Sequence, residues 1–261
     1  MDLGIKGKTA LVLGASQGLG AGIAAALAAE GCNLIIGSRN ETALGTMADD
    51  LRSRDGVEVA TYAIDLTDSG AVAGLCERIR NEYSVDILLN NAGGPPPSIS
   101  TGVSDEVWRN AIQGLMLSVI RVTEATVVGM RQRKWGRILT VASSGVVQPI
   151  PNLAVSNTVR SAIVGFSKTL SREVAADGVT VNLIIPGKIA TARSLVIDGA
   201  AAERLGLSME QVKEKNRAAI PAGRYGEVEE FANVAAFLLS DKASYVTGQM
   251  MRVDGGSIMS V

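Results

Sequence analysis

The chain contains no histidine among its 261 residues and only two cysteines, Cys32 and Cys76. Without histidine there is no Ser-His-Asp triad, and the commonest general base and metal ligand are both missing. The two cysteines have no metal-like spacing and lie in apolar stretches, so we expect buried free thiols. No acidic cluster replaces them as a set of ligands, and we expect no metal site.

Charge is sparse and balanced, with 25 basic against 26 acidic residues and no long run of either sign. A nucleic-acid partner would require a basic face, so we expect none. The start of the chain shows no secretory signal pattern, and no apolar run reaches membrane-spanning length. A hydrophobic content of 47% suits a chain long enough to bury a sizeable core. We therefore expect a soluble, cytoplasmic protein with a small-molecule substrate.

Apolar strand-like segments alternate with helix-like segments from the start of the chain. Strands are expected at Thr9–Leu13, Asn33–Gly37, Val57–Ala63, Asp86–Leu89, Arg137–Ala142, Thr180–Ile185 and Met250–Val253. Helices are expected at Gly18–Glu30, after the caps Asn40 and Asp68, and at about Ser104–Arg133, Asn152–Ala175 and Glu227–Leu239. The alternation predicts an α/β fold of the Rossmann type, a doubly wound, seven-stranded parallel sheet with helices on both faces. Without a repeat or linker, residues 1–261 are expected to form a single domain.

A glycine-rich turn joins the first strand to the first helix. Its glycines permit a tight turn and the close approach of a pyrophosphate, while the helix N-terminus offers free N–H groups and a positive dipole end. A tight turn without a ligand is the alternative interpretation. The residues of this turn that we expect to bind a dinucleotide are Gly14, Ser16, Gln17, Gly18, Leu19 and Gly20.

The end of the second strand indicates which dinucleotide is bound. An NAD site places an acid there for the ribose 2′-hydroxyl, whereas an NADP site has no acid and a nearby arginine for the 2′-phosphate. This chain has Ser38 followed by Arg39, whose guanidinium suits a phosphate. The sequence therefore predicts NADP(H) rather than NAD(H), with a solvated turn arginine as the alternative.

Further motifs follow the later strands. They are Asp65-Leu66, Asn90-Asn91-Ala92-Gly93, Pro186-Gly187-Lys188-Ile189-Ala190-Thr191, Arg224-x-Gly226 and Val253-Asp254-Gly255-Gly256. With the glycine turn, and in this order, they resemble the short-chain dehydrogenase/reductase family over nearly the whole chain. The resemblance implies the strand order 3-2-1-4-5-6-7. It also implies cofactor contacts at Asp65, Leu66, Asn91, Ala92, Gly93, Pro186, Gly187, Ile189 and Thr191. The alternatives are that Asp65 is only a turn residue and that Asn91 only fastens two strands.

The resemblance is incomplete at the catalytic residues. The family uses an Asn-Ser-Tyr-Lys set, in which the tyrosine donates a proton and the lysine holds the nicotinamide ribose. Here the serine is retained as Ser143, while the positions of the tyrosine, lysine and asparagine hold Ser156, Arg160 and Leu115. A serine hydroxyl is a far weaker acid than a phenol, and arginine releases no proton near neutrality. Arg160 can still donate to ribose hydroxyls.

Lys188 is a candidate for the missing proton donor, because a lysine beside a buried cofactor can become an acid near neutral pH. A lysine that points to solvent is the alternative. The expected catalytic residues are thus Ser143, Ser156, Arg160 and Lys188, with Ser144 and Gln148 facing the substrate.

These observations predict an NADP(H)-dependent oxidoreductase of a carbonyl or alcohol, 3-oxoacyl reductase-like, with a non-standard catalytic site. Two alternatives stay open: a dinucleotide-binding protein without redox turnover, and a lyase or isomerase that reuses the fold. The irregular segment at about 190–223 corresponds to the family's substrate lid, but its apolar residues do not identify the substrate. Family resemblance and the apolar faces of the two long helices also predict a homotetramer.

Overall fold

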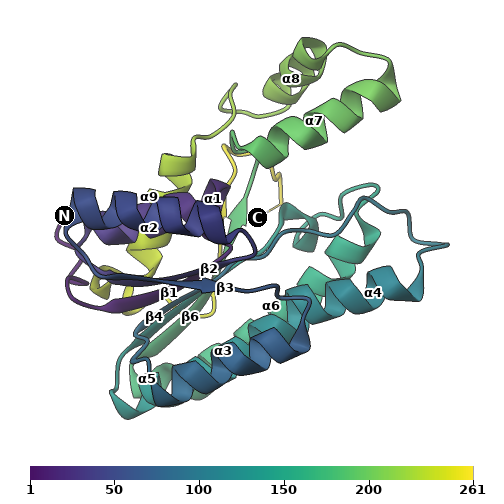
Figure 1. Cartoon of the computed structure of the whole chain (residues 1–261). Helices are drawn as coiled ribbons and strands as arrows, with labels where there is room; N and C mark the ends of the chain where they lie inside the picture. Colours follow the sequence, from purple (N-terminus) through teal and green to yellow (C-terminus); the bar gives the residue numbers. More distant parts are fainter. Residues whose placement is uncertain (261) are drawn as a thin grey trace.

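Seven parallel strands form one sheet in the computed structural model, which describes residues 1–260 (Figure 1). The strands are β1 (Thr9–Leu13), β2 (Asn33–Ser38), β3 (Val59–Ala63), β4 (Ile87–Asn90), β5 (Gly136–Val141), β6 (Val179–Pro186) and β7 (Met250–Val253). Their order is β3-β2-β1-β4-β5-β6-β7, and every neighbouring pair is parallel. The predicted fold class is confirmed, and the strand order agrees with the one that the resemblance implied.

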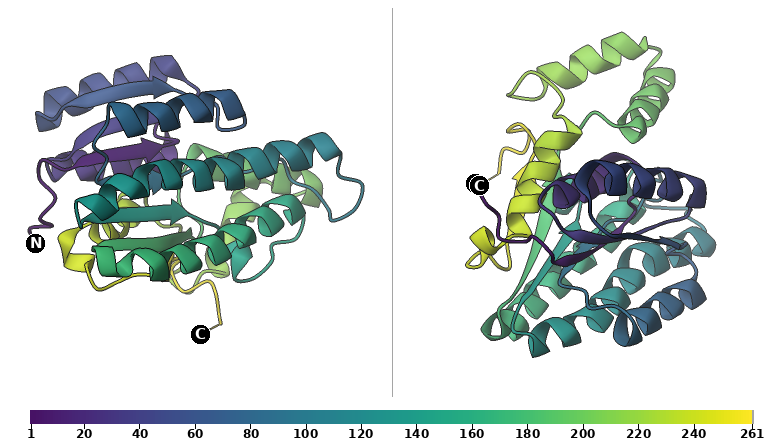
Figure 2. Two further views of the ribbon diagram at one scale, coloured as in Figure 1. Left: turned by 90° about the horizontal axis from the view of Figure 1, so that it is seen from below. Right: turned by 60° about the vertical axis from the view of Figure 1, so that its left-hand side comes forward.

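Helices cover both faces of this sheet (Figures 1 and 2). On one face lie α1 (Gly18–Ala29), α2 (Glu41–Asp55) and α9 (Val228–Leu238). On the other lie α3 (Ser69–Asn81), α4 (Asp105–Ile112), α5 (Ser118–Gln132) and α6 (Ala154–Val174). Five strands are buried almost throughout, which explains why they are largely apolar: β1, β2, β4, β5 and β6. The edge strands β3 and β7 are partly exposed.

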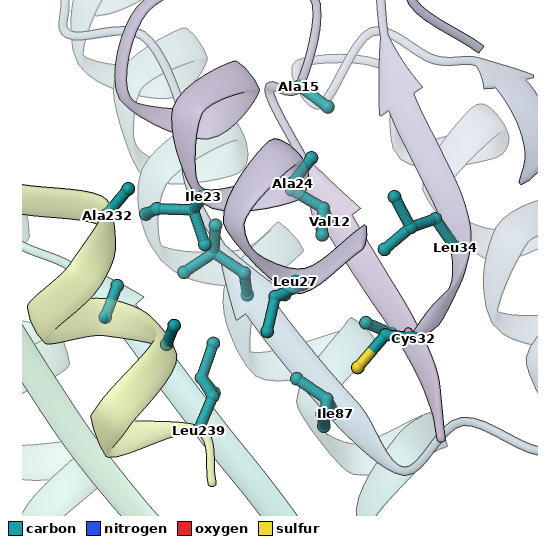
Figure 3. Packing of buried hydrophobic residues seen from close by; sticks show 14 of the residues in the cluster. Val12, Ala15, Ile23, Ala24, Leu27, Cys32, Leu34, Ile87, Ala232 and Leu239 are labelled. Carbon is teal, nitrogen blue, oxygen red and sulfur yellow. The ribbon is translucent and has the colours of Figure 1, made fainter. Parts of the chain in front are cut away.

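The core under α1 shows how this packing arises from the sequence (Figure 3). Ile23 and Leu27 of α1 are completely buried against Val12 of β1, and the adjoining α9 adds Phe231. Full burial of one such side chain contributes roughly 1.5–3 kcal/mol relative to exposure. This packing fixes the start of α1 at the carboxyl end of β1.

Two predicted elements differ from the structure. The third strand begins at Val59 rather than Val57, because Gly56 ends α2 in a left-handed conformation and the Glu58 N–H donates to the side chain of Asn33. The long helix predicted at 104–133 is interrupted by a π-helical turn, η1 (Gln113–Leu117). In this turn Gly114 packs closely on Thr67. The other predicted boundaries differ by two residues or fewer.

The interrupted helix Asp105–Gln132 is the one helix of the described residues that is long and apolar enough to cross a membrane. More than half of its most apolar window, 56%, is buried inside the molecule, where α5 packs on α3 and the sheet. Its apolar character is therefore explained by core packing.

Two helices stand away from the body at the carboxyl edge of the sheet, α7 (Ala192–Leu205) and α8 (Met209–Ala218) (Figures 1 and 2). Thr191 and Ser194 form a reciprocal capping box at the start of α7, and Gly206 ends this helix in a left-handed conformation. The helices α7 and α8 occupy the segment at about 190–223, whose sequence pattern is irregular. We call α7 and α8 the lid helices.

Candidate active site

The turn between β1 and α1 is shaped by backbone contacts that only glycine permits. Gly14 has a φ of +63°, and a Cβ there would lie 2.7 Å from both the side-chain nitrogen and the carbonyl oxygen of Asn91. A Cβ on Gly20 would lie 2.2 Å from the carbonyl oxygen of Gly14. The Asn91 side chain donates to that same carbonyl at 3.2 Å. Asn91 therefore fastens the end of β4 to the turn, and the turn cannot relax away from α1.

The N-terminus of α1 is open to an anion. Within residues 1–260 no side chain caps it, and its first turn contains no acidic residue. Its N–H groups and positive dipole end therefore point outward unneutralised. Thr191, which precedes α7, lies beside Gly18, so the motif after β6 reaches the start of α1.

The end of β2 presents one cation and no acid. Ser38 is buried and its hydroxyl accepts the Asn40 N–H at 3.2 Å, whereas Arg39 is exposed.

Two hydrogen bonds from Thr67, with a smaller effect of Arg39, hold the pKa of Asp65 below its usual range. Asp65 thus stays ionised and shapes its own turn, which is the alternative role considered for it.

The other residues predicted to contact a cofactor lie along the same edge. Ser16, Leu19, Leu66 and Ala92 are half-buried, Gln17 and Gly93 are exposed, and Ile189 is buried. Pro186 pairs with Val253 at the end of the sheet, and Gly187 donates its N–H to the Val253 carbonyl at 2.9 Å. These segments lie at the carboxyl ends of β1, β4 and β6, and the strand order reverses between β1 and β4, which is where a ligand crevice forms in folds of this type.

Arg160 links the ends of two strands. Its guanidinium donates to the carbonyl oxygens of Val141 at 2.9 Å and Ala92 at 3.0 Å. Burial, and then the nearby charge of Arg193, lower the pKa of Arg160 to about 10. The group therefore remains a cation at neutral pH, held in place by the backbone after β4 and within β5.

A cavity of about 10 Å³ lies next to Arg160, with room for roughly one water molecule. Leu115 and Asn90 also line it. Asn90 donates to Thr123 at 3.0 Å, while its side-chain oxygen has no hydrogen-bond partner among the described residues. Leu115, which is 5% exposed, lies in the π-helical turn η1.

Ser143 and Ser156 lie at the ends of neighbouring elements. The Ser143 hydroxyl accepts the Gly145 N–H at 3.1 Å, which leaves its own proton free to donate. Ser156 is buried in the first turn of α6, at 7% exposure. Of the predicted substrate residues, Ser144 is half-buried in the same loop as Ser143, and Gln148 is exposed.

Lys188 has contacts of a different kind. Its Nζ lies 3.9 Å from a carboxylate oxygen of Asp198 on α7 and 5.9 Å from the centre of the Tyr225 ring. Asp198 also accepts from the Tyr225 hydroxyl at 2.7 Å and from Asn216 of α8 at 2.9 Å. In the described chain no hydrogen bond or ion pair joins Lys188 to Ser143, Ser156 or Arg160.

Sequence reasoning missed Asp198 and Arg193. Asp198 is the one acid in the apolar run 195–202, which was a usable signal for a buried acid. The guanidinium of Arg193 lies over Gly94, 2.6 Å from the point where a Cβ on that glycine would stand. No local pattern indicates a contact between residues about a hundred positions apart.

Known proteins are similar to this chain in sequence and in structure. A family model described as enoyl-(acyl carrier protein) reductase matches residues 14–257. The 3-oxoacyl-[acyl-carrier-protein] reductase FabG of Escherichia coli K12 is 37% identical over 98% of this chain and 100% of that protein.

Solved structures agree with this result. The crystal structure of L-sorbose reductase from Gluconobacter frateurii, complexed with NADPH and L-sorbose, has a TM-score of 0.93 at 33% identity and full coverage of both chains. A 3-oxoacyl (acyl-carrier-protein) reductase from Agrobacterium tumefaciens C58 with NADP bound has a TM-score of 0.88 at 26% identity, over 97% of this chain and 95% of that one.

Proposed function

The chain belongs to the short-chain dehydrogenase/reductase family, and we propose that it is an NADP(H)-dependent oxidoreductase of a carbonyl or alcohol, similar to a 3-oxoacyl reductase but with a non-standard catalytic site. The observation that carries the proposal is the β1–α1 turn, where Gly14, Gly20 and Asn91 interlock beneath an uncapped helix N-terminus. An uncapped helix N-terminus at the end of a tight glycine turn is the arrangement that binds a pyrophosphate.

The residues present fit NADP(H). Gly14 and Gly20 let Asn91 and the turn pack directly beneath the N-terminus of α1, because a Cβ at either position would clash with protein atoms. Arg39 offers an exposed guanidinium for a 2′-phosphate beside a strand end without an acid. A bound NADPH would supply hydride to a substrate carbonyl. Neighbours solved with NADPH or NADP bound support this choice of cofactor.

In this proposal the catalytic positions of the family are altered at Ser156 and Arg160. The free hydroxyl of Ser143 would donate a hydrogen bond to a carbonyl oxygen and so hold the substrate. Arg160 would keep the ends of β4 and β5 in register and direct its remaining N–H groups to ribose hydroxyls, while retaining its own proton. The proton that a phenol would have delivered would then come from solvent or from Lys188.

The contacts of Lys188 favour a different role for it. A buried carboxylate needs a compensating cation, and Lys188 is the cation that pairs with Asp198, which is 2% exposed. The pairing supports Lys188 as a residue that positions the lid helices rather than as a proton donor. We further propose that residues 1–261 form a single domain with a substrate lid at about 190–223. A cytoplasmic location and a homotetramer remain predictions.

A cofactor titration combined with a turnover assay tests the proposal. NADPH should bind, and its absorbance should fall when 3-oxoacyl thioesters or ketoses are added. Binding without oxidation of NADPH by any carbonyl would favour a dinucleotide-binding protein without turnover, or a lyase or isomerase. Failure to bind either NADPH or NADH would overturn the proposal.

A further inference from the structure

We propose that Arg193 and Arg160 form a recognition site for a carboxylate on the substrate, so that the substrate is an oxo acid or the corresponding hydroxy acid. This inference rests on the proposed function, because it identifies the substrate class of that site. The argument depends on where the two guanidinium groups lie and on what they lack.

The two arginines converge on one loop from different elements. Arg160, on α6, donates to the carbonyl oxygen of Ala92, and Arg193, in the first turn of α7, lies against Gly94 two residues further along. Arg160 is fixed by its two backbone acceptors, whereas Arg193 is exposed and has no described hydrogen bond. The pair therefore consists of one fixed and one accessible forked donor.

Neither arginine has an acidic partner. Of the twelve ion pairs among residues 1–260, none includes Arg160 or Arg193. The charge of Arg193 is close enough to depress the pKa of Arg160, so the two cations repel each other. Lys188 differs from both, because Asp198 already compensates its charge.

The position of Arg193 on its helix is also unfavourable. It lies in the first turn of α7, where the positive end of the helix dipole disfavours a cation, and no acid occupies that turn. Arg204, in the last turn of the same helix, has the favourable placement. A residue that is electrostatically unfavourable in the unliganded protein in two ways is typical of a binding site, where stability is sacrificed for function.

A substrate carboxylate fits this site better than a cofactor phosphate does. The cofactor phosphates have their own place at the open N-terminus of α1, beside Gly18 and Thr191. Arg193 lies instead over Gly94, on the loop that Arg160 ties to Val141 at the end of β5, two residues before Ser143. The exposed fork of Arg193 matches the two oxygens of a carboxylate, and the fixed positive charge of Arg160 adds to the attraction. The carbonyl held by Ser143 and the carboxylate held by the arginines would thus belong to one small molecule.

The test compares Arg193→Met with Arg204→Met, its matched control on the same helix. Straight-chain 2-, 3- and 4-oxo acids, each paired with its methyl ester, are assayed with saturating NADPH. Wild type should prefer at least one acid over its ester, and Arg193→Met should lower kcat/KM for that acid by roughly ten- to a hundred-fold. In Arg193→Met, kcat/KM for the ester and the affinity for NADPH should change by less than about two-fold, because neither depends on the charge-assisted contact. In Arg204→Met, kcat/KM for the acid should also change by less than about two-fold.

Binding and stability measurements separate this inference from the proposed redox function. If no acid is reduced, calorimetry can still measure binding of the same acids to the protein saturated with NADP⁺. The Arg193→Met variant should then show no binding of these acids. In the absence of ligand Arg193→Met should melt at a higher temperature than wild type. A loss of NADPH affinity in Arg193→Met would overturn the inference, as would equal use of acids and esters or failure of every acid to bind. Failure of NADPH to bind wild type would instead overturn the proposed function.

Discussion

The crevice at the β1–α1 turn and the region around the lid helices are built in different ways. In the crevice, the shape is determined by glycines that leave no room for a Cβ and by side-chain-to-backbone hydrogen bonds such as that from Asn91 to Gly14. In the lid region, a few polar side chains hold two helices that otherwise stand away from the body, with Asp198 at their centre. We therefore expect the first region to tolerate almost no change and the second to accept other side chains. The difference explains how one fold keeps its cofactor site while its chemistry varies.

The largest effect is expected at the crevice. Gly20→Ala would place a Cβ 2.2 Å from the Gly14 carbonyl oxygen, so the turn would have to move. We expect the displaced turn to bind NADPH roughly a hundred-fold more weakly, or about 3 kcal/mol. Fluorescence titration with NADPH measures it. The control is Gly45→Ala in α2, where no atom lies within 4 Å of the new Cβ, so NADPH affinity should not change. Unchanged affinity in Gly20→Ala would remove the distinction between the two regions.

The next effect concerns the choice of cofactor. Arg39→Ala should weaken NADPH binding roughly ten- to a hundred-fold, because a charge-assisted contact to the 2′-phosphate contributes about 1.5–3 kcal/mol. Binding of NADH should change little, since NADH has no 2′-phosphate. Titration of both dinucleotides against wild type and variant checks this, and equal affinities of wild type for NADPH and NADH would contradict it.

A smaller effect is expected where the two regions meet. The double change Ser156→Tyr with Arg160→Lys should reduce the native turnover rather than create ordinary ketone reductase activity. The phenol enters a position that is 7% exposed. Lysine lacks the planar guanidinium with which Arg160 donates to the carbonyl oxygens of both Val141 and Ala92. Overpacking should cost about 1–3 kcal/mol of stability, measured by urea unfolding. A stable variant with new activity toward simple ketones would show that the altered residues reflect lost function.

The smallest effect is a pH dependence of the lid contacts. Burial and the hydrogen bond to Asp198 raise the pKa of Tyr225 from 10.0 to about 12. Between those values the folded protein retains a proton that the unfolded chain releases, so the stability contributed by Tyr225 falls as pH rises. The difference in unfolding free energy between wild type and Tyr225→Phe should therefore shrink across this range. A difference independent of pH would mean that the hydroxyl is not held by Asp198.

The two regions also differ in how far the sequence predicts them. The glycine turn, Asn91 and Ser38-Arg39 follow strands directly, so local pattern and strand order suffice to bring them together. The lid contacts cannot be predicted in this way, because Lys188, Asp198 and Asn216 meet only through the fold of two helices. The π-helical turn at Gln113–Leu117 was missed because close packing of Gly114 on Thr67 accompanies it, and no helical period indicates that contact.

The central claim is our proposal that the protein transfers hydride from NADPH and has Ser156 and Arg160 at the positions of its family's catalytic tyrosine and lysine. Incubation with NADPH deuterated at the reactive carbon of the nicotinamide, followed by mass spectrometry of the products, tests it directly. The account predicts an alcohol that carries one deuterium from the cofactor, formed from a carbonyl substrate by wild type and lost in Gly20→Ala. NADPH bound tightly to wild type, with no deuterium transferred to any carbonyl supplied, would contradict it.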